Sequence, residues 1–93
     1  MSYDPGAEAS AAFRAYAQRF ELSLLDIALA AKVRLLTVWN IAHGLPIRAE
    51  HAQAVRAGLH RLTGVPYTAL IPLIPVGILL MTQAQASPAE KQL

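Results

Sequence analysis

The sequence predicts an all-α domain of four to five short helices, followed by an extended apolar arm near the C-terminus. Three observations support this fold class. Apolar residues recur at helical spacing in several separate stretches. A capping box and a glycine mark helix ends between residues 22 and 44. Downstream, prolines interrupt a long apolar run, which disfavours a helix there and favours extended chain.

The chain is expected to start with a loose segment, residues 1–6, and then a first helix over residues 7–20. This helix is rich in alanine and carries Phe13, Tyr16 and Phe20 at helical spacing. Such an aromatic stripe can stack nucleic-acid bases, but the sequence lacks the other motifs of single-strand-binding folds. We therefore expect the stripe in the core.

A second helix is predicted from about Leu24 to Ala31. Ser23 and Asp26 have the spacing of a capping box, in which the hydroxyl and the carboxylate accept from early backbone N–H groups. The carboxylate also favours the positive end of the helix. Residues 32–34 then leave room for a turn.

A third helix is predicted over about residues 34–43, with Val38 and Ile41 on its apolar face and Gly44 closing it in the left-handed conformation. Two helices joined by a turn of three or four residues form a helix-turn-helix, whose second helix can enter a DNA major groove. Pro46 suits a bend before a further helix over residues 49–62.

An apolar arm is predicted over residues 67–82, with a flexible tail at 83–93. Residues 69–81 have no polar side chain, but these 13 residues are interrupted by prolines and are fewer than the roughly 20 that cross a bilayer. An uncovered arm would be an aggregation hazard. We therefore expect no membrane insertion and a homodimer. Its predicted interface residues are Leu70, Ile71, Leu73, Ile74, Val76, Ile78 and Leu79.

Composition and charge fit one small intracellular domain. The 93 residues are 55% hydrophobic, and the net charge is +2. Between residues 14 and 61, seven Lys or Arg stand against three acids, an excess compatible with phosphate contacts. The lack of Cys excludes disulfides and Cys-ligated zinc. Because no leader sequence is evident, we expect a cytoplasmic protein.

Residues 22–44 resemble the phage-repressor/Cro-like (XRE-type) helix-turn-helix family. The matching positions are Leu22, Ser23, Ile27, Ala28, Val33, Thr37, Val38, Ile41 and Gly44. With flanking helices included, the likeness spans about residues 12–66. It implies a small lambda-repressor-like DNA-binding domain, placed here at residues 7–66.

The resemblance implies a DNA-binding surface at the turn and the third helix. Its residues are Lys32, Arg34, Leu35, Leu36, Thr37, Trp39, Asn40 and His43. Only Arg34, Thr37 and Asn40 keep the polar chemistry of base and phosphate contacts, whereas the apolar residues can touch thymine methyl groups. Lys32 replaces the family's turn glycine, and Ala42 replaces its glutamate.

These observations predict a homodimeric, sequence-specific regulator that binds duplex DNA and represses by occlusion. Its two recognition helices would stand about 34 Å apart. The alternative is a helix-turn-helix scaffold that binds protein through Leu35, Leu36, Trp39 and the arm. Salt separates the two, since phosphate binding weakens with added salt and apolar contacts do not.

Enzyme chemistry, a metal site and a cofactor are not expected. Ser10, Ser23 and Ser87 lie in no nucleophile motif, and the sequence has no Gly-rich phosphate loop. The three histidines, His43, His51 and His60, do not have the spacing of a helical ligand pair.

Overall fold

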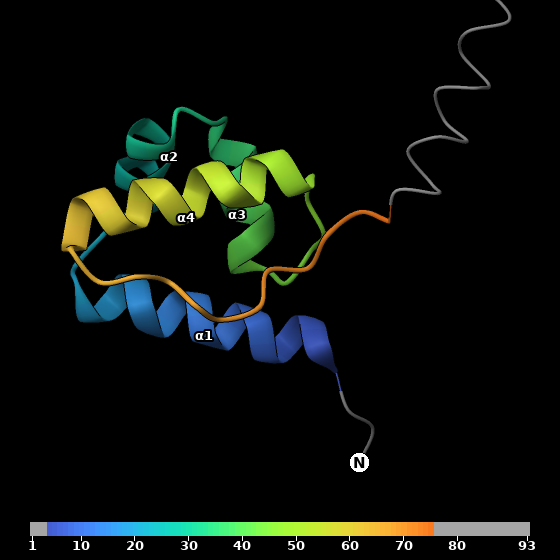
Figure 1. The fold of residues 1–93 in the computed structure, drawn as a ribbon. Coiled ribbons are helices and arrows are strands. Elements are labelled where there is room, and N and C mark those ends of the chain that lie inside the picture. Colours follow the sequence, from blue (N-terminus) through green and yellow to red (C-terminus); the bar gives the residue numbers. More distant parts are fainter. Residues whose placement is uncertain (1–3, 76–93) are drawn as a thin grey trace, which may run out of the picture.

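Four helices make up most of residues 4–75, the part of the chain that the computed structural model describes (Figure 1). They are α1 (Pro5–Arg19), α2 (Leu24–Ala31), α3 (Leu35–Ala42) and α4 (Ala49–Thr63). Helix α4 packs on α2, α1 packs on α3, and α2 contacts α3. Within residues 4–75 there is no strand beyond a single β-bridge, so the all-α prediction is confirmed.

Helix α1 starts at Pro5, two residues earlier than the sequence pattern predicts. The reason is a cap, because Asp4 Oδ1 accepts from the backbone N–H groups of Gly6 at 3.0 Å and Ala7 at 3.3 Å. Proline is well suited to the first helical position, where its missing N–H costs nothing. The predicted core residue Phe13 is fully buried.

Helix α2 has the predicted capping box. The N–H of Asp26 donates to Ser23 Oγ at 3.0 Å, and the N–H of Ser23 donates to Asp26 Oδ2 at 2.9 Å. The helix ends at Ala31 because Lys32 takes the left-handed conformation, with φ 57° and ψ 42°. Glycine adopts this conformation at lower cost, so the lysine carries some backbone strain.

This capping box predicts a pH-dependent contribution to stability. Hydrogen bonds from the backbone and the hydroxyl of Ser23 hold the pKa of Asp26 below its ordinary value of 3.8. A carboxyl group whose pKa is lower in the folded than in the unfolded state stabilises the fold. This contribution is complete above the unfolded-state pKa and is lost as the pH falls through the folded-state pKa. Asp26→Asn should therefore melt below the wild type at neutral pH. In thermal melts followed by circular dichroism, this difference should shrink below about pH 3.8, whereas a constant difference would contradict the account.

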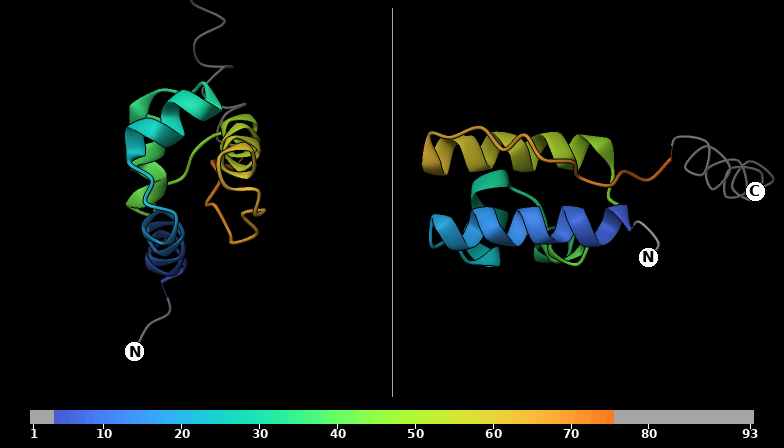
Figure 2. Two further views of the ribbon diagram at one scale, coloured as in Figure 1. Left: turned by 90° about the vertical axis from the view of Figure 1, so that its left-hand side faces the viewer. Right: turned by 90° about the horizontal axis from the view of Figure 1, so that it is seen from below.

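The core lies between the four helices and the chain that follows α4. Its largest fully buried side chains are Phe13, Ile27, Ile41, Leu59, Ile71, Val38 and Val55. Residues 65–75 run back beside α1 and α4 (Figures 1 and 2), and Tyr67 and Ile71 from this segment are buried. The segment thus completes the core of its own chain.

The stretch around Pro72 is extended, as its prolines predict. The N–H of Ile47 donates to the carbonyl of Pro72 at 3.1 Å, and the N–H of Ile74 donates to the carbonyl of Ile47 at 2.8 Å. These bonds form a parallel bridge between Ile47 and Leu73. They fix the segment to the link between α3 and α4.

The predicted dimer-interface residues fall in different environments. Leu70 and Leu73 are exposed and Ile74 is half-buried, while Ile71 packs into the core of its own chain. Val76, Ile78 and Leu79 lie outside the described residues, so the arm as a whole stays a prediction. None of the helices within residues 4–75 has both the length and the hydrophobicity to cross a membrane.

Candidate nucleic-acid interface

Helix α3 has one buried and one exposed side. Val38, Ile41 and Ala42 are buried, whereas Leu35, Leu36 and Trp39 are exposed. Because the side chains of a helix repeat every 3.6 residues, the buried set fixes the rotation of α3 and turns the other three residues outward. The interpretation of Trp39 as a surface residue agrees with this arrangement.

A hollow of about 560 Å³ lies between the turn at residues 32–34, α3 and the first turn of α4. We call it the basic groove. Its lining includes five of the predicted site residues, Lys32, Arg34, Leu36, Thr37 and Asn40, together with Val33, Arg48 and His51. The fold therefore adds Arg48 and His51 to the predicted set. Their nearness to α3 depends on the path of the link between α3 and α4, which the sequence pattern does not specify.

Several cations outside the groove are engaged by backbone carbonyls. Arg14 Nε donates to the carbonyl of Ala42 at 2.7 Å, and Arg56 donates to the carbonyl of Tyr67 at 2.6 Å. Arg61 donates to the carbonyl of Ala30, near the end of α2, at 2.5 Å. The mild positive excess of the sequence is therefore partly used in holding helices and loops together.

The cations of the basic groove are more available. Arg48 pairs with Glu50 at 3.3 Å, and because the two side chains are 47% and 68% exposed, this ion pair contributes little to stability. Within residues 4–75, neither Lys32 nor Arg34 pairs with an acidic side chain. The groove thus presents three cations to solvent.

Two helix N-termini reinforce this positive field. Asp4 caps α1 and Ser23 caps α2, but no side chain caps α3 at Arg34 or α4 at Arg48. Both of these helix starts lie at the groove. Unpaired N–H groups and the helix dipole make a helix start attractive to anions such as phosphate.

An apolar patch adjoins the basic groove on the exposed side of α3, and Leu36 lines both. Leu35, Leu36 and Trp39 line a hollow of about 320 Å³. On neighbouring α2, Leu25 is 55% exposed and Leu29 is 69% exposed. These two leucines lie four residues apart and off the buried face of α2, a spacing by which the sequence could have indicated them.

His43 contacts Trp39 and does not line the basic groove. The two rings stack with their centroids 3.8 Å apart at an angle of 21°, and His43 Nδ1 lies 2.8 Å from the carbonyl oxygen of Trp39. This contact closes the C-terminal end of α3. Among the described residues, no group of three His, Asp or Glu side chains is placed to hold a metal ion.

Comparisons of the chain with protein-family models, with characterised proteins and with solved structures find no match. The candidate site therefore rests on the chemistry of these residues alone.

Proposed function

We propose that this protein binds duplex DNA as a homodimeric transcriptional regulator of the cytoplasm, with α3 in the major groove. The observation that supports this function best is the basic groove, in which Lys32, Arg34 and Arg48 surround the uncapped starts of α3 and α4. Phosphate contacts of this kind supply nearly all of the non-specific affinity of DNA-binding proteins and a large share of the specific affinity.

The proposal treats α2, residues 32–34 and α3 as a helix-turn-helix of the XRE type. Four positions that match the family pattern, Ile27, Ala28, Val38 and Ile41, are buried. Buried residues at these positions hold the second helix against the first and leave its outer side for DNA. The resemblance and the packing thus support the same assignment.

Each part of the surface then has a role. Lys32, Arg34 and Arg48 hold phosphates, while Thr37 and Asn40 reach base edges, where an asparagine can bind adenine through two hydrogen bonds. Leu35, Leu36 and Trp39 contact thymine methyl groups. A repressor of this kind acts by occluding the DNA that it covers.

Dimerisation through the C-terminal arm is part of the same proposal. Within the described residues, Leu70 and Leu73 offer exposed apolar side chains to a second copy. A two-fold dimer that reads successive major grooves needs its two α3 helices about 34 Å apart.

The function is tested by fluorescence anisotropy with random-sequence duplex DNA over a series of salt concentrations. If Lys32, Arg34 and Arg48 each neutralise one phosphate, the slope of log K against log salt is about −3 per protomer. Arg34→Ala should make this slope shallower by about one. Arg19→Ala, which removes the same charge from α1, should leave it unchanged. Lack of binding at low salt by the folded protein would overturn the proposal.

The apolar patch favours a second candidate function, the binding of a protein partner. Exposed Leu25, Leu29, Leu35, Leu36 and Trp39 are unusual on two short helices of a small domain. Leu36 also borders the basic groove, so the matching partner is an amphipathic helix with acidic residues beside its apolar stripe. Binding of such a peptide that persists at high salt and is lost in Leu36→Asp, without any DNA binding, would favour this function.

A further inference from the structure

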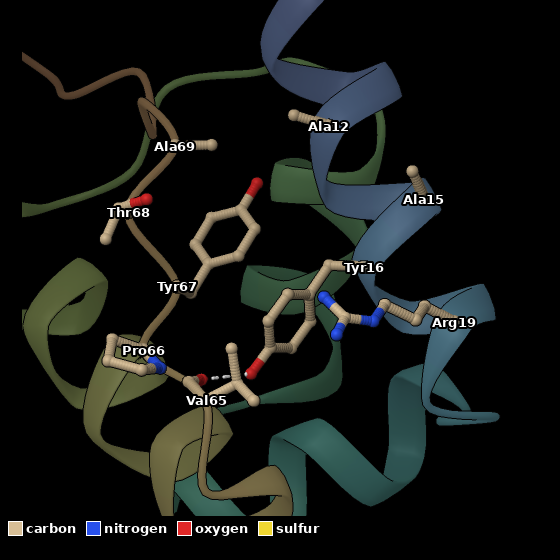
Figure 3. A pocket seen from close by; sticks show the side chains of 9 residues that line it. All are labelled: Ala12, Ala15, Tyr16, Arg19, Val65, Pro66, Tyr67, Thr68 and Ala69. Carbon is tan, nitrogen blue, oxygen red and sulfur yellow. Dashed lines mark hydrogen bonds between the residues drawn. The ribbon is translucent and has the colours of Figure 1, made fainter.

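A second groove lies between α1 and the segment at residues 65–69 (Figure 3). We call it the α1 groove. Its volume of about 430 Å³ is in the range of small-molecule sites. It shares no lining residue with the basic groove, so a ligand site here can be tested with variants that leave the basic groove unchanged.

The walls of the α1 groove combine apolar and aromatic side chains with the polar side chains of Thr68 and Arg19. Ala12 and Ala15 of α1 and Ala69 of the returning segment contribute only methyl groups, which leaves space beside the rings. The rings of Tyr16 and Tyr67 stand nearly perpendicular, with centroids 5.0 Å apart. A flat ring suits such walls, because aromatic rings pack edge to face and against methyl groups.

Tyr67 has an unused hydroxyl group. The residue is 5% exposed, and its buried Oη has no hydrogen-bond partner among the described residues. Figure 3 shows this hydroxyl pointing toward the gap between Ala12 and Ala69. In contrast, Tyr16 Oη lies 2.5 Å from Thr63 Oγ1 and donates to the carbonyl of Val65 at 2.6 Å. A buried donor without an acceptor is costly, and a ligand oxygen would remove that cost.

The donor character of Tyr67 is retained over the physiological pH range. Burial raises the pKa of Tyr67 to about 12, while the nearby positive charge of Arg56 opposes this shift. The same Arg56 donates to the backbone carbonyl of Tyr67, which holds the segment in place. The hydroxyl of Tyr67 therefore stays a neutral donor at the wall of the groove.

Arg19 supplies a positive charge at one end of the groove. Its guanidinium group lies 4.7 Å from the centre of the Phe20 ring and beside Tyr16 (Figure 3). Within residues 4–75 it has no acidic partner. A planar guanidinium in this position suits a carboxylate, which it can bind through two hydrogen bonds.

We propose that the α1 groove binds a small planar aromatic carboxylate that carries a second oxygen at its far end. The ring packs against Ala12, Ala15 and the tyrosines, and the carboxylate binds Arg19. The second oxygen accepts from Tyr67, which requires a small outward adjustment of the returning segment because the hydroxyl is covered.

The test is a titration of the ¹⁵N-labelled full chain with para-coumarate, followed by NMR. Saturable shifts are expected at amides of α1 and of residues 65–69. Cinnamate, which lacks the hydroxyl, and coumaryl alcohol, which lacks the charge, should both bind more weakly. Arg19→Ala should weaken binding of para-coumarate about tenfold.

Tyr67→Phe separates a ligand contact from a structural role. This variant should bind para-coumarate about fivefold more weakly but bind cinnamate with unchanged affinity. Its melting temperature should stay equal or rise, since the variant removes an unpartnered hydroxyl. Arg34→Ala, in the basic groove, is the matched control and should have no effect. Shifts that do not saturate, or affinities that neither Arg19→Ala nor Tyr67→Phe changes, would overturn the proposal.

Discussion

Replacing Gly44 with alanine is expected to lower the free energy of unfolding by about 3 kcal/mol. Gly44 has a φ of +72°, in the left-handed region that side chains disfavour. A Cβ built there would also collide with the backbone carbonyl of Gly6, whose carbon would be only 2.7 Å away. The substitution would therefore force the start of α1 away from the end of α3.

Gly64 provides the matched control for this prediction. It has nearly the same φ, +75°, but a Cβ there would meet nothing within 4 Å. Gly64→Ala should therefore lower the free energy of unfolding by about 1 kcal/mol, the cost of backbone strain alone. Urea unfolding of the two variants measures the difference. Equal losses would contradict the close approach of Gly6 and Gly44.

The largest functional effect is expected for the double charge reversal Arg34→Glu and Arg48→Glu. Each change removes a proposed phosphate contact and adds a repulsion, so DNA affinity at about 0.1 M salt should fall at least about 100-fold. If only the overall positive charge of the protein attracted DNA, the loss of affinity would be smaller. Charges more than about 10 Å from the DNA are screened at moderate salt.

The control for this variant is the pair Arg19→Glu and Arg61→Glu, which changes the net charge equally and lies outside the basic groove. The DNA affinity of this control variant should fall by less than about fivefold. Anisotropy titrations compare the DNA affinities of the two double variants, and circular dichroism establishes that each is folded. A similar loss in the two variants would mean that net charge, and not the groove, attracts DNA.

Local signals explain why much of the fold was predictable. The capping box at Ser23 and Asp26 and the left-handed Gly44 are set by neighbouring residues, and the structure contains both. The apolar spacing of Val38 and Ile41 likewise identifies the buried side of α3. Such features depend on contacts within a few residues, which a sequence pattern reveals.

The rest depends on contacts between distant residues. Arg14 donates to the carbonyl of Ala42, 28 positions later, and no periodic pattern in the sequence indicates such a bond. The path of the link after α3 brings Arg48 and His51 to the basic groove. In the same way, Ile71 is part of an apolar run that predicts an interface, yet it completes the core of its own chain.

Trp39, the sole tryptophan of the chain, gives the most direct test of the central claim that α3 binds DNA. It is exposed on the outer side of α3, so bound DNA would change its surroundings. We predict that the tryptophan fluorescence changes saturably as duplex DNA is added at low salt and recovers as salt is raised. Binding seen by anisotropy without any change in Trp39 emission would place the DNA elsewhere, and a lack of binding would contradict the account.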